Sequence, residues 1–426
     1  MATPLKLAGQ NGLQSFIILD VSTNEFVDLT SSVDGILLVE SIDLSAINAT
    51  ATISDFTDLL NIFPLKGDEH AIINLKAETN SPEETIERTL VFRITKVENI
   101  GIESESVAAG IEIKMISEFA YEQEFINIDE YFSDTITNTV TKIHNRVIDT
   151  GNFLADPESY ELKTTETNGS MNFIIPSETP FDSINRYCCA WAFNQDYLSS
   201  LWYYFQSTKG YRFINIEQIY EEAPSANDDY WKSHTYGTYG KNENTDSAAM
   251  YTALSFRQLS RNNSFALASI GAINHNIKEL SYTFKSFNTQ SYNYLDQSYN
   301  IEGSELIRSD DYVEKYSTVP KETHWLYRDS TASNFFNYES MPHKWAMSRL
   351  FYNNVLQMNV VGNPALTVGE LVDIKVPRQT TFVSGEIQLD KTISGKYIIK
   401  DIQTQLGVGT YRQQLNLIRP GAVEFG

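Results

Sequence analysis

Apolar and polar residues alternate in six short segments of the first quarter of the chain. The segments are rich in Ile, Val and Thr, are separated by polar turns, and cover residues 15–22, 35–45, 49–56, 70–78, 88–98 and 110–117. In the last one, Ile111, Ile113 and Met115 alternate with Glu112 and Lys114, which is typical of a strand with one buried face. Six such strands predict a small antiparallel barrel or sandwich.

A helical period replaces this alternation near residue 121. Apolar side chains recur at spacings of three and four residues over 133–148, which predicts an amphipathic helix with one buried stripe. Ser133 or Asp134 can serve as its N-cap, because a short polar side chain accepts a hydrogen bond from the first turn.

A second helix is predicted over residues 179–193. Thr179 can cap it, Pro180 suits its first position, and Asp182 can face the free N–H groups of the first turn. Cys188 falls on the apolar face and is predicted to be a buried hydrophobic side chain. It and Cys189 are the two cysteines of the chain, and such neighbours rarely form a disulfide, so synthesis in a reducing compartment is expected.

Strands return after residue 200 and again after residue 345. Two aromatic strands over 200–220 are predicted to turn at 208–210. The following segment, 221–344, is long, polar and aromatic, and is interpreted as an insertion. The chain then closes with strands at 354–362 and 371–377 and a hairpin over 394–421 that turns within 407–409.

The same order of features occurs twice. Gly67-Asp68-Glu69 leads into an apolar strand, a loop, a long strand and a shorter returning strand, and Gly369-Glu370 leads into the same series. Such self-similarity indicates one β unit present in two copies, with chance likeness between alternating strands as the alternative. With two copies per chain, three chains would present six similar modules around one axis.

The charge of the chain is acidic and uneven. The formal net charge is −23, which disfavours nucleic acid and anionic membranes as binding partners. Residues 1–130 hold 23 acids and 7 bases, a net charge of −16. A solvated surface is the ordinary interpretation, and a surface that repels another polyanion is the sharper one. No segment approaches the length of a membrane-spanning helix, so no membrane insertion is expected.

The sequence contains no recognisable catalytic or metal-binding motif. The six histidines are scattered, and there is no His-Glu-x-x-His, no Gly-x-Ser-x-Gly and no phosphate-binding loop. The acid pairs at 221–222 and 310–311 lie in polar stretches, and the isolated His234 is ordinarily structural or solvated. We therefore expect no enzyme activity, no cofactor and no metal.

Four blocks, in this order along the chain, resemble the baseplate central hub proteins of contractile-tailed bacteriophages. They are NFIIPSETPFDSINRYCCAWAF (172–193), WYYFQSTKGYRFINIEQIY (202–220), LQMNVVGNPALTVGELVDIKVP (356–377) and the closing hairpin (394–421). The motif residues are Pro180, Phe181, Asp182, Gly210, Gly362, Asn363, Gly369 and Gly395. The likeness spans about residues 33–421 and extends to the first part of type VI secretion spike proteins. No β-helix tail follows Gly421, so the spike is expected to be a separate chain.

This resemblance implies a mainly β fold with α+β insertions. Each chain would hold two similar tube-type antiparallel β-barrels plus two inserted subdomains. The expected domains are a first barrel at 1–120, an α+β insertion with two helices at 121–199, a second barrel at 200–220 and 345–421, a polar and aromatic insertion at 221–344, and a tail at 422–426.

The resemblance also implies a structural role in the tail baseplate of a virion, after synthesis in the host cytoplasm. A homotrimer would form a pseudo-sixfold ring that joins the hexameric tail tube protein to the trimeric central spike protein, with the tape measure and other baseplate proteins as further candidates. DNA would pass without specific binding. Asp68, Glu69, Glu98 and Glu112 are then candidates for an acidic lumen or surface that repels DNA.

Two other functions are compatible with parts of the sequence. The aromatic stretch 281–300 could stack on sugars, as in a tail adhesin or glycan-binding protein, and strong selective binding on a glycan array would favour that function. A tail-associated hydrolase would release fragments from cell wall, and we expect none.

Overall fold

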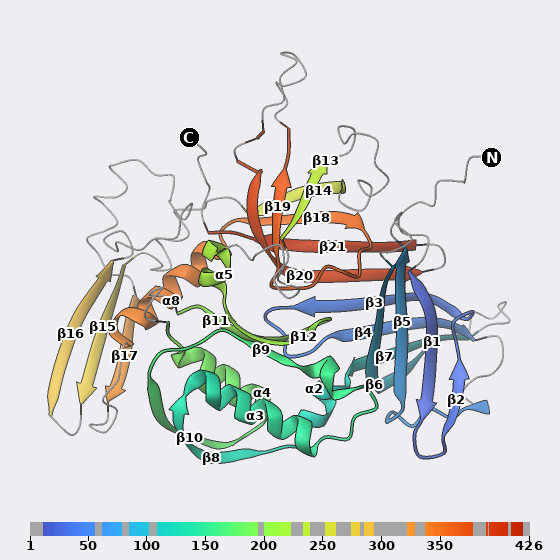
Figure 1. Cartoon of the computed structure of the whole chain (residues 1–426), viewed down its shortest axis with the longest axis horizontal. Helices are drawn as coiled ribbons and strands as arrows, with labels where there is room; N and C mark the ends of the chain where they lie inside the picture. The colour runs from blue at the N-terminus through green and yellow to red at the C-terminus, as the bar shows by residue number, and fades with distance from the viewer. Residues whose placement is uncertain are drawn as a thin grey trace.

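The structure is a computed structural model, and it confirms the mainly β part of the expected fold class (Figure 1). A sheet of 13 strands runs through two β units, and three smaller sheets and several helices lie beside it among the described residues. The structure describes residues 12–55, 62–78, 85–101, 109–194, 200–222, 233–238, 252–260, 274–281, 285–293, 322–328, 337–377, 389–390, 392–407 and 410–420.

The N-terminal β unit contains the six strands that the alternation predicts. They pair antiparallel in the order β3-β4-β7-β6-β5-β1, and a short seventh strand, β2, extends the edge. The sequence pattern misses β2 because it has four residues and hardly any buried side chain. The strands are β1 (Leu13–Asp20), β2 (Glu25–Asp28), β3 (Val33–Ser41), β4 (Asn48–Asp55), β5 (His70–Glu78), β6 (Thr85–Gly101) and β7 (Ala109–Ser117).

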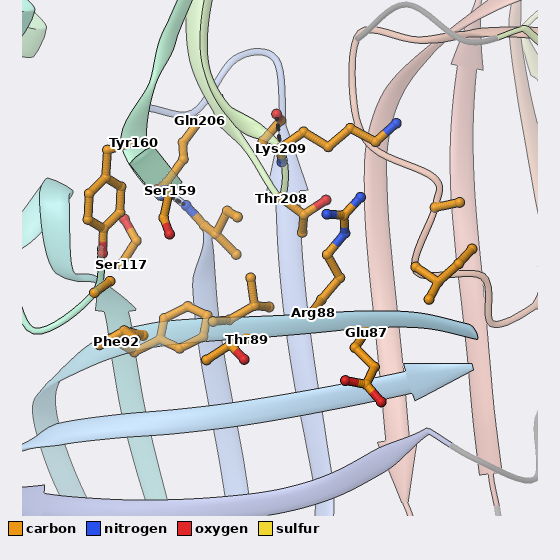
Figure 2. Close-up of a pocket in the computed structure, with 17 residues that line it drawn as sticks. Glu87, Arg88, Thr89, Phe92, Ser117, Ser159, Tyr160, Gln206, Thr208 and Lys209 are labelled. Atoms are coloured by element: carbon orange, nitrogen blue, oxygen red, sulfur yellow. Dashed lines mark hydrogen bonds between the residues drawn. The ribbon is translucent and has the colours of Figure 1, made fainter. Parts of the chain in front are cut away.

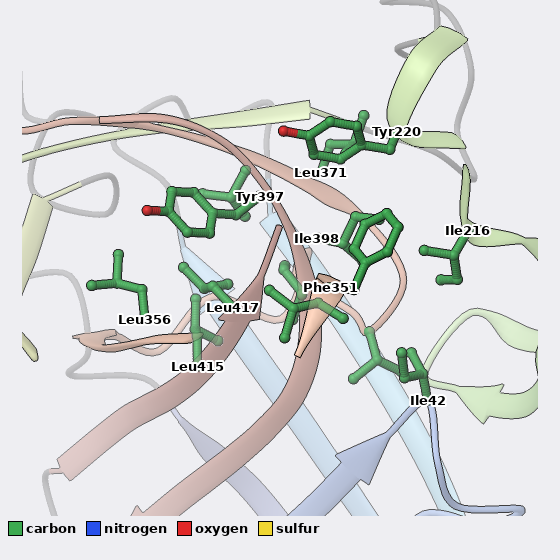
Figure 3. Packing of buried hydrophobic residues seen from close by; sticks show 14 of the residues in the cluster. Ile42, Ile216, Tyr220, Phe351, Leu356, Leu371, Tyr397, Ile398, Leu415 and Leu417 are labelled. Carbon is green, nitrogen blue, oxygen red and sulfur yellow. The ribbon is translucent and has the colours of Figure 1, made fainter. Parts of the chain in front are cut away.

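The C-terminal β unit consists of six strands whose pairings close on themselves. Each strand is hydrogen-bonded to the next in the order β13-β14-β18-β21-β20-β19, and β19 pairs again with β13. Aliphatic and aromatic side chains fill the interior (Figure 3). The strands are β13 (Ser233–Thr238), β14 (Thr252–Ser260), β18 (Val355–Val361), β19 (Leu371–Lys375), β20 (Gly395–Gly407) and β21 (Thr410–Ile418).

Two of these strands come from the segment that the sequence analysis treats as an insertion. β13 pairs with β19, and β14 pairs with β18, so both belong to the large sheet. The closing hairpin, in contrast, has the expected form, with Gly407 opposite Thr410 at its end.

Strand β20 joins the two β units. Its first residues pair with β19, while residues 401–407 pair antiparallel with residues 35–41 of β3 (Figure 1). The 13-stranded sheet is continuous because this one long strand contributes to both units.

A third core lies beside the sheet and contains the two expected helical regions. Helix α3 begins at Ile136 rather than at residue 133, because residues up to Thr135 belong to strand β8; Thr135 therefore provides the cap, not Ser133 or Asp134. The elements are α2 (Glu118–Gln123), β8 (Ile128–Thr135), α3 (Ile136–Thr150), a 3-10 turn (Pro157–Tyr160), β9 (Leu162–Thr164) and β10 (Ser170–Glu178).

The second predicted helix is present with the expected start. Thr179 accepts a hydrogen bond from the Asp182 amide at 3.3 Å, and Pro180 occupies the first turn of α4 (Pro180–Ser183). The helix continues as a π-helical segment, Ile184–Cys189. Cys188 is buried and unbridged, as predicted, and burial raises the pKa of its thiol.

The strands after residue 200 pair differently from the expectation. The sequence predicts that 200–220 joins the late strands in the second barrel, yet β11 (Trp202–Ser207) and β12 (Gly210–Asn215) form a sheet with β9. The residues that follow form α5 (Ile216–Glu222) instead of continuing the strand. Every residue of β12 is buried, so its sequence lacks the alternation of apolar and polar residues that distinguishes a half-buried strand from a buried helix.

The remaining elements form a small sheet and a helix at one end of the molecule (Figure 1). Within the stretch 281–300, Tyr292 is buried and its hydroxyl lies 3.0 Å from Nδ1 of His343, whereas Phe287 is exposed. The elements are β15 (Asn274–Ser281), β16 (Ser286–Asn293), β17 (Glu322–Arg328) and α8 (Asn337–Phe351).

Candidate functional site

Each β unit begins one strand after a turn that holds a glycine with positive φ and a buried glutamate. Gly67 (φ 95°) lies two residues before Glu69, which precedes β5, and Gly369 (φ 81°) lies directly before Glu370, which precedes β19. Both glutamates are buried, and each accepts a hydrogen bond from the amide three residues earlier, at 2.6 Å from Lys66 and 3.3 Å from Thr367. A positive φ favours glycine, and the buried acid satisfies turn amides that would otherwise lack a partner.

The correspondence continues along the next strand. The Ile94 amide donates to the Glu69 carbonyl at 2.9 Å, and the Ile399 amide donates to the Glu370 carbonyl at 2.9 Å. The pairing with the returning strand then shifts register directly after Ile94 in β6 and directly after Ile399 in β20. A β-bulge is a specific feature of a strand, so its presence at the same place in both units is a detailed structural agreement.

Glu370 makes an ion pair that has no counterpart around Glu69 among the described contacts. Its carboxylate lies 2.5 Å from Nζ of Lys209, which sits on the turn between β11 and β12, and 4.0 Å from the Arg212 guanidinium. All three side chains are buried or nearly so. Burial and the neighbouring Arg212 lower the pKa of Lys209, while Glu370 opposes this.

Glu40 brings the N-terminal β unit into the same group. It lies on β3, and its Oε2 accepts hydrogen bonds from the Thr208 amide (3.2 Å) and the Thr367 hydroxyl (3.1 Å). Burial raises the pKa of Glu40 to about 7. We refer to Glu40, Lys209, Arg212, Thr367 and Glu370 as the junction cluster, because it connects both β units with the β11–β12 turn.

The stability of the protein should depend on pH through Glu40. The folded state holds the Glu40 proton up to about pH 7, whereas an unfolded glutamate loses it near its ordinary pKa of 4.5. Stability therefore falls as pH rises between these values and changes no further above pH 7 from this group. We expect Glu40→Gln to stabilise the protein at pH 8 by roughly 3 kcal/mol, and to have much less effect at pH 5.

Urea denaturation of both proteins at pH 5 and pH 8 measures this difference. Glu25→Gln on the exposed strand β2 is a matched control, and its effect should be small at either pH. An equal effect of Glu40→Gln at the two pH values would contradict the assignment.

Three of the motif glycines lie where another residue would be strained or would clash. Gly210 (φ 100°) and Gly395 (φ 132°) both have a positive φ. A Cβ on Gly362 would lie 2.1 Å from the Tyr411 ring. The buried Asn363 fixes the next turn, because its Oδ1 accepts from the Ala365 amide at 2.9 Å.

The remaining motif residues lie in the third core. Pro180 and Asp182 form the first turn of α4, as described above. The Phe181 ring packs 6.2 Å from the Tyr204 ring, measured between ring centroids. The motif residues therefore lie in three places: the start of α4, the β11–β12 turn, and turns or strand starts of the C-terminal β unit.

The four candidate acids lie in two places, the turn before β5 and the neighbouring strands β6 and β7. Asp68 is exposed, but Glu69 is buried and bonded to backbone amides. Glu98 and Glu112 face each other across β6 and β7, and both pair with Lys114, at 2.9 Å and 3.2 Å. Hydrogen bonds from Lys96 and Lys114 lower the pKa of Glu98 to about 2. Neighbouring lysines thus offset part of the negative charge on this surface.

A second buried polar group was not identified from the sequence. Glu118 accepts hydrogen bonds from Nε2 of His70 (2.8 Å), the Leu154 amide (2.6 Å) and the Tyr160 hydroxyl (3.0 Å). Burial raises the pKa of Glu118, but the hydrogen bonds from His70 and from the Leu154 and Ala155 amides outweigh it, and the pKa is lowered. Its only signal in the sequence is an acid next to the apolar Phe119, whereas Glu40 could have been noticed as an acid inside a strand of apolar residues.

No group of three or more His, Cys, Asp or Glu side chains in the described part of the chain is arranged to hold a metal ion. Among the same residues, no helix is long and apolar enough to cross a membrane.

The fold matches solved phage tail proteins over nearly the whole chain. One is the 43 kDa tail protein of prophage MuSo2 from Shewanella oneidensis, with a TM-score of 0.54, 10% identity, and coverage of 96% of this chain and 99% of that one. Another is the tail protein from Neisseria meningitidis MC58, with a TM-score of 0.51, 8% identity, and coverage of 96% and 99%. At these identities the likeness establishes the fold.

A weaker similarity links the chain to the E. coli c3393 protein, a component of the type VI secretion system. The TM-score is 0.40 at 8% identity, with coverage of 93% of this chain and 76% of that one. No protein-family model matches the chain, and no curated protein sequence matches it.

Proposed function

We propose that the protein is a structural baseplate hub of a contractile phage tail. Three copies form a pseudo-sixfold ring that joins the hexameric tail tube to the trimeric central spike, and DNA passes through the ring. The observation that carries this proposal is that the two β units share a buried glutamate bonded to a turn amide, a carbonyl contact and a bulge, since one fold present twice per chain lets a trimer imitate a hexamer. The match to solved tail proteins across both β units supports it.

On this proposal the protein works through shape and contacts, without enzymatic chemistry or a cofactor. Each β unit is a tube-type barrel, the junction cluster fixes one barrel against the other, and the elements between them are inserted subdomains. The bound partners are further copies of the chain, the tube protein and the spike protein. The virion tail is therefore the site of action.

Mass measurement by light scattering tests the oligomeric state. The chain has a mass of 48.3 kDa, so we expect a particle of about three times that mass, alone or once the spike protein is added. A monomer that remains a monomer in the presence of the spike would contradict the proposal.

An exposed strand edge provides a variant that locates the contact between copies. Phe26 on the edge strand β2 is 68% exposed, and apolar side chains on unpaired edges favour association. We expect Phe26→Glu to weaken the trimer. Phe125→Glu is the matched control, because Phe125 is 73% exposed but lies outside the sheet. Equal loss of trimer in both variants would place the contact elsewhere.

A further inference from the structure

A cavity of about 620 Å³ opens between the N-terminal β unit and the β11–β12 turn (Figure 2). One wall is the first half of β6, and the opposite wall is the turn 206–209. The 3-10 turn before β9 and the loop around Ala365 complete the lining. The volume is in the range of sites that hold small organic ligands or a few residues of a peptide.

Arg88 is an unusual side chain for its position in this wall. It lies opposite Leu75 across β5 and β6, and residues opposite each other in a sheet point to the same face. That face is the core face, because Leu75 and the next residues in phase on β6, Leu90 and Phe92, belong to the apolar core. Arg88 thus places a guanidinium where the pattern would otherwise have an apolar side chain.

The Arg88 guanidinium lacks a counter-charge among the residues that the structure describes. It forms no hydrogen bond or ion pair with the described residues, and its Nε is buried. A half-buried cation without a counter-charge costs free energy, because it loses hydration and gains nothing in return. Figure 2 shows the side chain reaching into the cavity towards Thr208, whose buried hydroxyl also lacks a hydrogen-bond partner.

Below about pH 7 the charges around the cavity leave an excess of positive charge, because burial keeps Glu40, which accepts from the Thr208 amide, protonated there. Lys209 and Arg212 share the Glu370 carboxylate, and Arg88 is a third cation near them, whose charge contributes to lowering the pKa of Lys209. Glu87 also lines the cavity, but it is exposed and paired with Lys76 at 2.9 Å. In a chain of net charge −23, such a local positive site favours the binding of an anion at this position.

We propose that this cavity is an oxyanion-binding site, in which Arg88 and the Thr208 hydroxyl hold a carboxylate or phosphate group. The planar guanidinium offers paired donors that match both groups. The remaining wall, with Ile86, Phe92 and Ala155 beside Ser159 and Gln206, contacts the body of the ligand. The site is independent of the proposed hub function, because it needs no second copy of the chain.

Thermal unfolding of the full-length protein in phosphate or succinate, against sodium chloride of equal ionic strength, tests the site. We expect about 10 mM of an effective anion to raise Tm by about 2 °C or more, since a ligand that binds the folded state stabilises it. Arg88→Gln should abolish the rise and weaken binding in calorimetry by about tenfold or more, the loss expected for a charge-assisted contact. Arg257→Gln, at an exposed position on β14, should behave as the wild type.

The variants also report on folding. Because Arg88 forms no ion pair with the described residues, Arg88→Gln should be at least as stable as the wild type in chloride, and Arg88→Lys should keep part of the anion effect. A response to succinate alone assigns a carboxylate ligand such as an acidic peptide, and a response to phosphate alone assigns a phosphorylated one. No response to either anion, an equal response of Arg88→Gln, or a marked loss of stability of that variant in chloride would overturn the proposal.

Discussion

Glu370→Ala should destabilise the protein by about 4 kcal/mol, because it leaves Lys209 and Arg212 buried beside an empty position. The Thr367 amide also loses its acceptor. Urea denaturation at pH 7 measures the change as a lower midpoint. Combining it with Lys209→Met should recover part of the loss, since an apolar side chain tolerates the position better than an unpaired ammonium.

Glu69→Ala is the matched control. Glu69 occupies the equivalent turn and accepts from the amides of Lys66, Gly67 and Asp68, but no lysine pairs with it among the described contacts. These amides belong to exposed or half-buried residues, where water can replace the lost acceptor, so we expect a cost of only about 1–2 kcal/mol. Equal losses for Glu370→Ala and Glu69→Ala would show that the buried ion pair contributes nothing to stability.

Gly210→Ala should destabilise the protein by about 3 kcal/mol. At φ 100° an alanine is strained, which costs about 1–2 kcal/mol by itself. Its Cβ would also lie 2.6 Å from the Glu161 carbonyl oxygen. That oxygen cannot move away freely, because it accepts a hydrogen bond from the Tyr211 amide at 2.9 Å next to the pairing of β12 with β9. Thermal or urea denaturation measures the effect.

Gly67→Ala separates the two contributions. Gly67 has a similar φ of 95°, but a Cβ there would meet nothing within 4 Å. Only the backbone strain remains, so the expected loss is about 1 kcal/mol. If both alanine variants lose the same stability, the contact between the Glu161 carbonyl oxygen and residue 210 contributes nothing to the cost of Gly210→Ala.

Strand β7 and helix α4 illustrate what the sequence predicts well. The alternation of Ile111, Ile113 and Met115 places three side chains in a core, and all three are buried. Thr179 and Pro180 mark the helix start because capping depends on residues that are neighbours in the chain. The glycine and acid of the two turns can also be recognised in the sequence, whereas their hydrogen bonds cannot.

The alternation of side chains, the caps, the glycine turns and the excess of acid were determined by the sequence itself, since each depends on residues within a few positions of one another. Tertiary structure alone decided that β11 and β12 pair with β9, that β13 and β14 enter the large sheet, and that β20 joins both β units. It also decided that Glu40, Lys209 and Glu370 meet in one cluster. Backbone hydrogen bonds are nearly the same for every residue type, so they do not reveal which strands pair. Strands that are far apart in the sequence are brought together by the packing of whole cores, and a local sequence pattern cannot show this.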